Sequence, residues 1–137
     1  MRRKTTVAAV LAITLIASTT AAMAAGKSGG TSSVWLVRYG QTAPAAATAP
    51  SFGEQVTFAF TTSKTTRPWV LNECFQDGVR VSAEVHGFFD GYMFGQVYTL
   101  GPTDRWTGGA ADCTATLLSE DHNTTQVLAT ATYSVTG

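Results

Sequence analysis

The sequence predicts an all-β antiparallel domain, and two observations lead to that prediction. From Glu54 onward the chain is rich in Thr, Val, Phe and Tyr, which follow a two-residue alternation between Gly and Pro residues. No stretch after residue 25 keeps the apolar period of a helix over about 11 residues. Strands that alternate in this way have one face toward the core and one toward water, as is common in antiparallel sheets.

The first 24 residues have the pattern of a secretory signal peptide. Basic residues at positions 2–4 precede a mostly apolar run over 7–17, and Ala22-Met23-Ala24 supplies a small-x-small cleavage site. The run is shorter than the about 20 apolar residues of a membrane span, and a retained N-terminal anchor is the alternative interpretation. The expected organisation is a signal peptide over 1–24, a flexible leader over 25–33 and a single domain over 34–137.

Cleavage after Ala24 would make the remaining chain acidic. It removes three of the nine Lys and Arg residues and none of the nine Asp and Glu residues, so six basic side chains face nine acidic ones, a net charge of −3. An acidic domain without a basic stripe is poorly suited to phosphate backbones, so we expect no nucleic-acid partner. We expect a secreted, extracellular protein with no membrane attachment after cleavage, and neither a metal nor another cofactor.

Cys74 and Cys113 are the only cysteines, and export would place both in an oxidising compartment. We therefore expect one Cys74–Cys113 disulfide. On the chain-entropy model it stabilises the fold by roughly 4 kcal/mol, because it closes a loop of about 40 residues. A metal or redox pair is the alternative, but it would need a closer spacing such as C-x-x-C with a histidine nearby.

Strands are expected in turn along the domain. A short first strand over 34–39 precedes a linker over 42–50, which contains only Ala, Thr and Pro and is not expected to be helical. Three later segments alternate clearly, at 55–61, 111–117 and 126–135. Their expected core-facing side chains are Val56, Phe58 and Phe60, then Ala111, Cys113, Ala115 and Leu117, then Val127, Ala129, Ala131, Tyr133 and Val135.

The segment Gln76-Asp77-Gly78-Val79 predicts a β-hairpin, because Asp-Gly is a preferred centre of two-residue turns. With Gln76 opposite Val79, the turn places Cys74 opposite Val81 and Asn72 opposite Ala83. The inward face of the hairpin is then expected to carry Val70, Cys74, Val79, Val81, Ala83 and Val85. Two independent alternation patterns thus direct both cysteines into the core, which supports their pairing.

The outward face of the same hairpin carries more large apolar side chains than a solvent face needs. Trp69, Leu71 and Phe75 all fall on this face. Two explanations are open: residues 34–50 cover these side chains, or the side chains bind a ligand.

About six or seven short strands and one inter-strand disulfide in an exported domain of roughly 100 residues resemble a secreted bacterial immunoglobulin-like or fibronectin-like β-sandwich. The residues that carry the resemblance are Gly53-x-x-Val56-x-Phe58, Trp69-x-x-x-x-Cys74, the Asp77-Gly78 hairpin, Gly109-Ala-Ala-Asp-Cys113 and the closing strand over 127–135. The resemblance implies an antiparallel immunoglobulin-like β-sandwich of about seven strands. Immunoglobulin domains have a Trp between their two Cys, whereas here Trp69 precedes Cys74. We therefore expect the disulfide to join a different pair of strands, such as neighbours in one sheet, and no family site is carried over.

Aromatic residues in two loops are candidates for recognition. The run Phe88-Phe89-Asp90-Gly91-Tyr92-Met93-Phe94 would supply large contact areas, with Met as an adaptable contact. The alternative is a strand and turn whose rings plug one end of the domain, and Trp106 in its Gly- and Pro-bounded loop has the same two interpretations. The candidate binding residues are Trp69, Leu71, Phe75, Phe88, Phe89, Tyr92, Phe94 and Trp106.

Residues suited to catalysis are few. Glu84 and His86 lie two apart on one strand face and Asp90 follows, so an acid–base trio can be drawn, but no G-x-S-x-G context accompanies it. The Ser119-Glu-Asp-His-Asn123 turn lacks the carboxylate spacing of a calcium loop and is expected to be a polar hairpin end. No catalytic residue is therefore expected.

The sequence favours a small secreted, non-catalytic binding module. Its aromatic-rich sheet face and loop would contact an extracellular protein or a second copy of the chain. A carbohydrate-binding module at the cell surface is the alternative, since aromatic rings on a sheet face can stack on sugar rings. A hydrolase or a protease inhibitor is a third interpretation.

Overall fold

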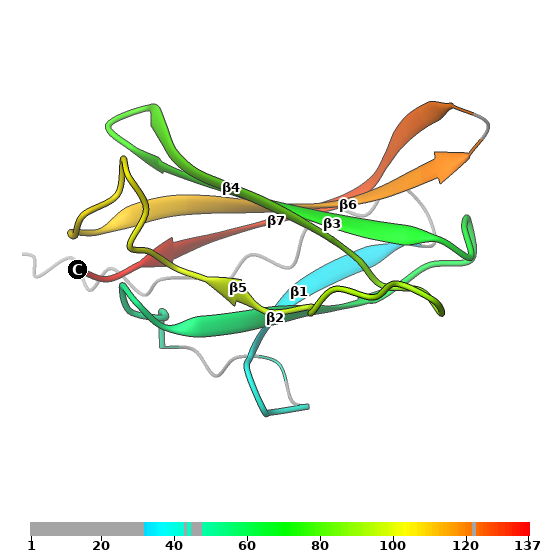
Figure 1. Cartoon of the computed structure of the whole chain (residues 1–137), viewed down its shortest axis with the longest axis horizontal. Helices are drawn as coiled ribbons and strands as arrows, with labels where there is room; N and C mark the ends of the chain where they lie inside the picture. Colours follow the sequence, from blue (N-terminus) through cyan, green and yellow to red (C-terminus); the bar gives the residue numbers. More distant parts are fainter. Residues whose placement is uncertain (1–31, 43, 45–47, 122) are drawn as a thin grey trace, which may run out of the picture.

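Seven β-strands and no helix make up the part of the chain that the structure, a computed structural model, describes (Figure 1). The described residues are 32–42, 44, 48–121 and 123–137, so the expected signal peptide and most of the expected leader lie outside them. None of the described segments is a helix long and apolar enough to cross a membrane. The strands are β1 (Ser33–Arg38), β2 (Gln55–Thr61), β3 (Pro68–Gln76), β4 (Val79–Gly87), β5 (Tyr98–Thr99), β6 (Ala111–Asp121) and β7 (Thr124–Val135).

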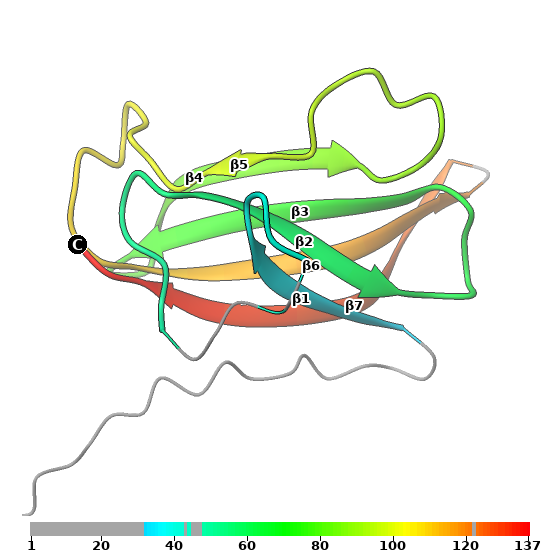
Figure 2. The same cartoon turned by 90° about the horizontal axis from the view of Figure 1, so that it is seen from below.

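The strands form two antiparallel sheets that face each other, which confirms the predicted all-β class (Figures 1 and 2). One sheet has the order β1-β2-β5 and the other has the order β4-β3-β6-β7. Side chains from both inner faces meet in a single core. Its members include Val34, Leu36, Val56 and Phe58 from the first sheet, and Val70, Cys74, Cys113, Ala115 and Leu117 from the second.

The disulfide joins Cys74 of β3 to Cys113 of β6, and the two residues are direct partners in the strand register. The prediction of a disulfide between two core-facing cysteines is confirmed, because both residues are at most 1% exposed. The two strands are neighbours in one sheet, as expected from the departure from the immunoglobulin pattern. A disulfide of this kind is consistent with an extracellular or otherwise oxidising environment.

The predicted hairpin turn is present, but the register changes after the first two pairs of the hairpin. Asp77 and Gly78 both have positive φ, at 49° and 77°, and Gln76 pairs with Val79 as predicted. A bulge between Cys74 and Phe75 then shifts the pairing by one residue. As a result Cys74 faces Ser82 instead of Val81, and Asn72 faces Glu84 instead of Ala83.

The bulge reverses the predicted faces of most of β4. Of the valines and alanine predicted to point inward, only Val81 is buried, whereas Val79, Ala83 and Val85 are exposed. Conversely, Glu84 and His86 pair with the inward-facing residues of β3 and therefore lie on the inner side of the sheet. The predicted inward face was wrong for β4 because hairpin geometry alone gives no sign of an inserted residue.

A second bulge corrects the prediction for β7. The register shifts between Leu117 and Leu118 of β6, and Leu128 of β7 is the unpaired residue. Consequently Leu128 is buried, although it was predicted to point outward, and Val127 is 59% exposed, although it was predicted to face the core. The other predicted inward residues of β7 and all those of β6 are buried.

Two tyrosine hydroxyls are satisfied inside the core. The hydroxyl of Tyr98 donates to the backbone carbonyl of Val70 at 2.6 Å, and that of Tyr133 donates to Oδ1 of Asn72 at 2.8 Å. Burial raises the pKa of both phenols far above the ordinary value of 10.0, because a charged phenolate would lose its hydration. Both groups therefore stay protonated in the folded protein where they would ionise in the unfolded chain.

Stability is expected to fall steeply at alkaline pH because of these two tyrosines. Above about pH 10 the unfolded chain releases phenolic protons that the folded protein keeps, so the free energy of unfolding falls by up to about 1.4 kcal/mol per pH unit for each group. Urea unfolding between about pH 8 and pH 11 measures the slope. Tyr133→Phe should be less stable at neutral pH, since Asn72 loses its donor, but its slope above pH 10 should be shallower than that of the native protein. Parallel curves for the two proteins would contradict the assignment.

Candidate binding surface

The outer face of the four-stranded sheet carries a row of apolar side chains that neither sheet covers. Strand register places Trp69 of β3 beside Leu118 of β6, Leu118 beside Val127 of β7, and Leu71 beside Val85 of β4. We call these five residues the outer strip. Val85 and Val127 are 47% and 59% exposed, and the other three are half-buried. The described part of 34–50 does not pair over this face, since β1 belongs to the opposite sheet.

A pocket of about 230 Å³ lies within the outer strip. Trp69, Val85 and Leu118 form its apolar lining, and Glu120 and Thr125 form the rest. A hollow among exposed apolar side chains can take an apolar side chain of another molecule, and burial of that side chain supplies the driving force.

The aromatic loop over 88–97 folds across the edge of β4 onto Trp69. Phe89 and Tyr92 pack edge-on against the Trp69 ring, with centroid distances of 5.2 and 5.5 Å. Gly87 makes this possible, because a Cβ there would lie 2.5 Å from Phe89 and 2.8 Å from Tyr92. Any side chain at position 87 would push the two rings off the sheet.

The tip of the aromatic loop extends the apolar surface beyond the sheet. Met93 is 90% exposed and Phe94 is 70% exposed, and Phe94 packs edge-on against Tyr92 at 5.5 Å. Single exposed apolar residues are ordinary on a protein surface, but these two adjoin Tyr92, Trp69 and the outer strip. The exposed apolar area is therefore continuous from the loop tip to the sheet.

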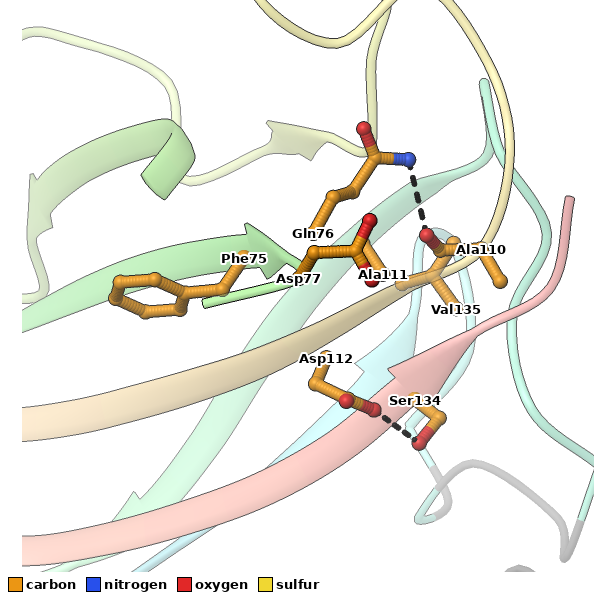
Figure 3. Close-up of a pocket in the computed structure, with 8 residues that line it drawn as sticks. All are labelled: Phe75, Gln76, Asp77, Ala110, Ala111, Asp112, Ser134 and Val135. Carbon is orange, nitrogen blue, oxygen red and sulfur yellow. Dashed lines mark hydrogen bonds between the residues drawn. The ribbon is translucent and has the colours of Figure 1, made fainter. Parts of the chain in front are cut away.

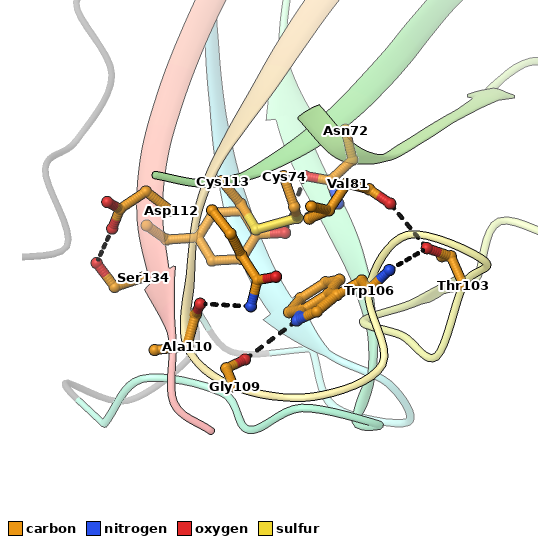
Figure 4. The surroundings of a disulfide bond; sticks show 12 residues. Asn72, Cys74, Val81, Thr103, Trp106, Gly109, Ala110, Asp112, Cys113 and Ser134 are labelled. Carbon is orange, nitrogen blue, oxygen red and sulfur yellow. Dashed lines mark hydrogen bonds between the residues drawn. A yellow bond between two sulfur atoms is a disulfide. The ribbon is translucent and has the colours of Figure 1, made fainter. Parts of the chain in front are cut away.

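The remaining predicted binding residues are not part of this area. Phe88 points inward and packs at right angles on Phe60, so it belongs to the core boundary. Trp106 is completely buried, its indole nitrogen donates to the carbonyl of Gly109 at 3.1 Å, and it lies near the disulfide (Figure 4). Its burial leaves Trp106 no part in an exposed contact surface and matches the interpretation in which the ring plugs one end of the domain.

Phe75 lies on the outer face but is separated from the outer strip. The ion pair between Glu73 and Arg80, at 2.9 Å, lies on this face between Leu71 and Phe75. Phe75 instead borders a larger pocket of about 460 Å³ at the hairpin end of the sheet (Figure 3).

The pocket beside Phe75 is mostly polar, and three of the polar side chains that line it, Gln76, Asp112 and Ser134, already have hydrogen-bond partners within the chain. The Gln76 amide donates to the carbonyls of Gly108 and Ala110, and the Ser134 hydroxyl donates to Asp112 at 2.9 Å (Figure 3). Groups already paired in this way offer less to a ligand than free ones. No group of three or more metal-ligating side chains occurs in the described part of the chain. The outer strip is therefore the stronger candidate, although its pocket is smaller.

Two of the three polar residues considered for catalysis, Glu84 and His86, connect the inner side of β4 to the aromatic loop. Nε2 of His86 lies 2.8 Å from a carboxylate oxygen of Glu84, and Nδ1 lies 3.3 Å from the Tyr92 hydroxyl. Because an ionised carboxylate can only accept, Nε2 donates to Glu84, and Nδ1 is left to pair with the Tyr92 hydroxyl. The His86 ring also packs edge-on against Tyr98 at 4.6 Å. Neither partner of the imidazole nitrogens is a serine, threonine or cysteine side chain.

Three residues of the surface were not singled out for binding from the sequence, Val85, Leu118 and Val127, whereas Met93 was named as an adaptable contact of the aromatic run. Leu118 follows a buried leucine in an alternating strand, so the predicted parity of 111–117, extended by one residue, would have placed it outside. The two valines were predicted to point inward, and only the bulges expose them.

A scan against protein-family models found no match to the chain, and neither did searches of curated proteins and of solved structures. The fold and the exposed outer strip together define the structural class of the protein. The protein is an all-β sandwich with one in-sheet disulfide and an exposed apolar sheet face.

Proposed function

We infer that the protein is a small secreted, non-catalytic binding module that holds a protein partner on the outer strip and the tip of the aromatic loop. One observation carries the proposal: apolar side chains from all four strands of one sheet lie side by side on a face that the second sheet does not cover. A continuous exposed apolar patch is typical of a protein-interaction surface.

The ring geometry favours a protein over a carbohydrate. The planes of Trp69, Phe89 and Tyr92 are inclined to one another by 63–82°, so these rings do not form a flat platform. Sugar rings stack on aromatic faces that lie parallel to them. Most of the exposed apolar area comes instead from Val85, Val127, Met93 and the edge of Phe94, which suit aliphatic and aromatic side chains of a protein.

Secretion and an immunoglobulin-like classification belong to the same proposal. The signal-peptide pattern of 1–24 supports export, and the disulfide fits the oxidising environment that export would provide. Two facing antiparallel sheets with one disulfide support an immunoglobulin-like architecture.

Val85→Asp is expected to weaken partner binding by at least about tenfold, because it places a charge in the apolar pocket beside Trp69. Val79→Asp is the matched control: it is also an exposed valine of β4, but it lies at the turn outside the outer strip. Both proteins and the native one are immobilised, and the proteins that each retains from the native culture medium and cell surface are compared.

Three results would contradict the proposal. Equal retention of the same proteins by the native protein and Val85→Asp would exclude the outer strip. Equal losses with Val79→Asp and Val85→Asp would point to net charge rather than to a site. Retention of the native protein on an insoluble polysaccharide, lost in Val85→Asp, would replace the protein partner by a carbohydrate.

A further inference from the structure

The four-stranded sheet has two edges, and only the β4 edge is covered. The Thr103 hydroxyl donates to the Val81 carbonyl at 2.7 Å, and the Gln96 amide donates to the Gly87 carbonyl at 3.1 Å. Charged side chains on β4, among them Arg80 and Glu84, protect the same edge. Natural sheets commonly use such devices to prevent the addition of another strand.

The β7 edge has neither a bonded loop side chain among the described residues nor a charge on the strand, and beyond the bulge at Leu128 its pairing is regular from Ala129 to Val135. Its 12 residues include no charged residue, no proline and no glycine. β1 passes close to β7, but among the described residues the backbone hydrogen bonds to this outer edge lie past the end of the strand, where Thr136 pairs with Pro50 and Phe52 at 2.8 Å. A long neutral strand with an open edge is a template for pairing with another strand.

The strand register identifies which backbone groups of β7 point outward. The Cα atoms of Cys74 and Cys113 are 4.1 Å apart, the short spacing of an antiparallel pair whose backbone groups point away from each other. The backbone groups of Cys113 therefore point toward β7 and bond to those of Tyr133. Along β7, the backbone groups of successive residues point alternately toward β6 and away from it, so those of Thr130 and Thr132 point away. Within the described part of the chain no hydrogen bond occupies the N–H and C=O groups of these two residues, so an incoming strand can pair with them.

A groove beside the β7 edge provides room for that strand. It has a volume of about 400 Å³. Its lining residues are Ser32, Lys64, Gln126, Val127, Leu128, Ala129 and Thr130. The groove thus follows five of the 12 residues of the strand, up to Thr130.

We propose that β7 pairs antiparallel with β7 of a second copy of the chain, to give a two-fold symmetric dimer with a continuous eight-stranded sheet. In such a pair each β7 strand lies opposite an identical strand. Because β7 contains no charged residue, no like charges of the two strands lie opposite each other at the junction. Threonines and alanines fill the middle of the junction, and Thr–Thr pairs across strands are favourable. Because the β4 edge is covered, the assembly closes at two copies instead of growing into a fibre.

The dimer shares only Val127 with the outer strip, and it does not depend on the proposed function. Val85 lies on the far strand of the sheet, so Val85→Asp should leave the dimer intact while it weakens partner binding. Failure of one proposal is therefore distinguishable from failure of the other.

Thr132→Pro is expected to raise the dimer dissociation constant by at least about tenfold, as measured by sedimentation equilibrium of the purified protein. Proline removes an outward N–H and leaves the bonds to β6 intact. Thr132→Lys should have the same effect because it puts charge at the junction. Thr114→Lys, on the β6 residue that pairs with Thr132, is the matched control and should remain dimeric.

Amide hydrogen exchange adds a second measurement. The N–H groups of Thr130 and Thr132 should exchange slowly at concentrations where the protein is dimeric and rapidly after dilution. A native protein that is monomeric up to about 1 mM would overturn the proposal. So would slow exchange at both residues in the monomer, which would mean that the chain's own residues cover the edge.

Discussion

Replacement of both Cys74 and Cys113 by alanine is expected to lower the free energy of unfolding by about 4 kcal/mol. The crosslink spans 39 residues of sequence and joins β3 to β6, the two central strands of the four-stranded sheet. Without it, the unfolded chain gains the conformations that the closed loop forbids. A typical domain is stable by about 5–15 kcal/mol, so this loss is a large fraction of the total.

Urea unfolding of three samples separates the crosslink from packing. Comparison of oxidised with reduced native protein isolates the crosslink, because both samples fill the same space in the core. Comparison of reduced native protein with the double alanine variant isolates packing around two residues that are at most 1% exposed. A difference below about 1 kcal/mol between oxidised and reduced protein would show that the unfolded state is already constrained by other means.

The disulfide was predictable because the alternation of inward and outward side chains is regular in the residues next to each cysteine. Cys113 lies in an uninterrupted alternation, and Cys74 lies next to a turn whose residues identify it. Both cysteines therefore had a defined inward direction before any pairing of strands was known. The departure of Trp69 from the immunoglobulin spacing correctly indicated an unusual pair of strands.

The outer strip was only partly predictable, because two bulges determine which side chains it contains. Trp69 and Leu71 were placed on the outer face by the strand period, and they lie there. Val85 and Val127 joined them only because each is separated by an inserted residue, Val81 in β4 and Leu128 in β7, from the part of its strand that determined its predicted face, and neither bulge has a glycine or other local signal. A single inserted residue exchanges the two faces of everything beyond it.

The aromatic loop could not be resolved from sequence because its residues divide between two roles. Phe88 packs into the core, Phe89 and Tyr92 lie on Trp69, and Phe94 is exposed. A loop has no period from which such a division can be read. The close approach at Gly87, which lets the loop reach the sheet, became visible only in three dimensions.

The loop and the outer strip depend on each other for their shape. Tyr92 contacts Trp69 with its ring and His86 with its hydroxyl, and Glu84 holds the other side of the imidazole. The aromatic rings nearest the outer strip are thus held by contacts from the inner side of β4. Side chains fixed before binding lose less entropy when a partner arrives, which suits them to a contact surface.

Trp106→Ala is expected to destabilise the protein by about 3–5 kcal/mol, which is the usual cost of removing a large buried aromatic side chain. Trp106 heads the fully buried side chains in volume, and its ring packs on Phe52 at 5.3 Å. The change also leaves the Gly109 carbonyl without its indole donor. Trp106→Phe should retain part of the packing, so its loss should fall between those of the native protein and the alanine variant.

Trp69→Ala provides the comparison that separates stability from binding. Trp69 is half-buried on the outer face, so its removal should cost less stability than removal of Trp106, but it should reduce partner binding. Trp106 lies in the loop beside Val81, at the opposite end of β4 from the aromatic loop, so Trp106→Ala should bind normally whenever it is folded. Urea unfolding measures the loss of stability in each variant, and partner retention at low temperature measures the loss of binding. A Trp106→Ala protein that is folded yet fails to bind, or one destabilised by less than about 1.5 kcal/mol, would show that Trp106 is not the structural plug described above.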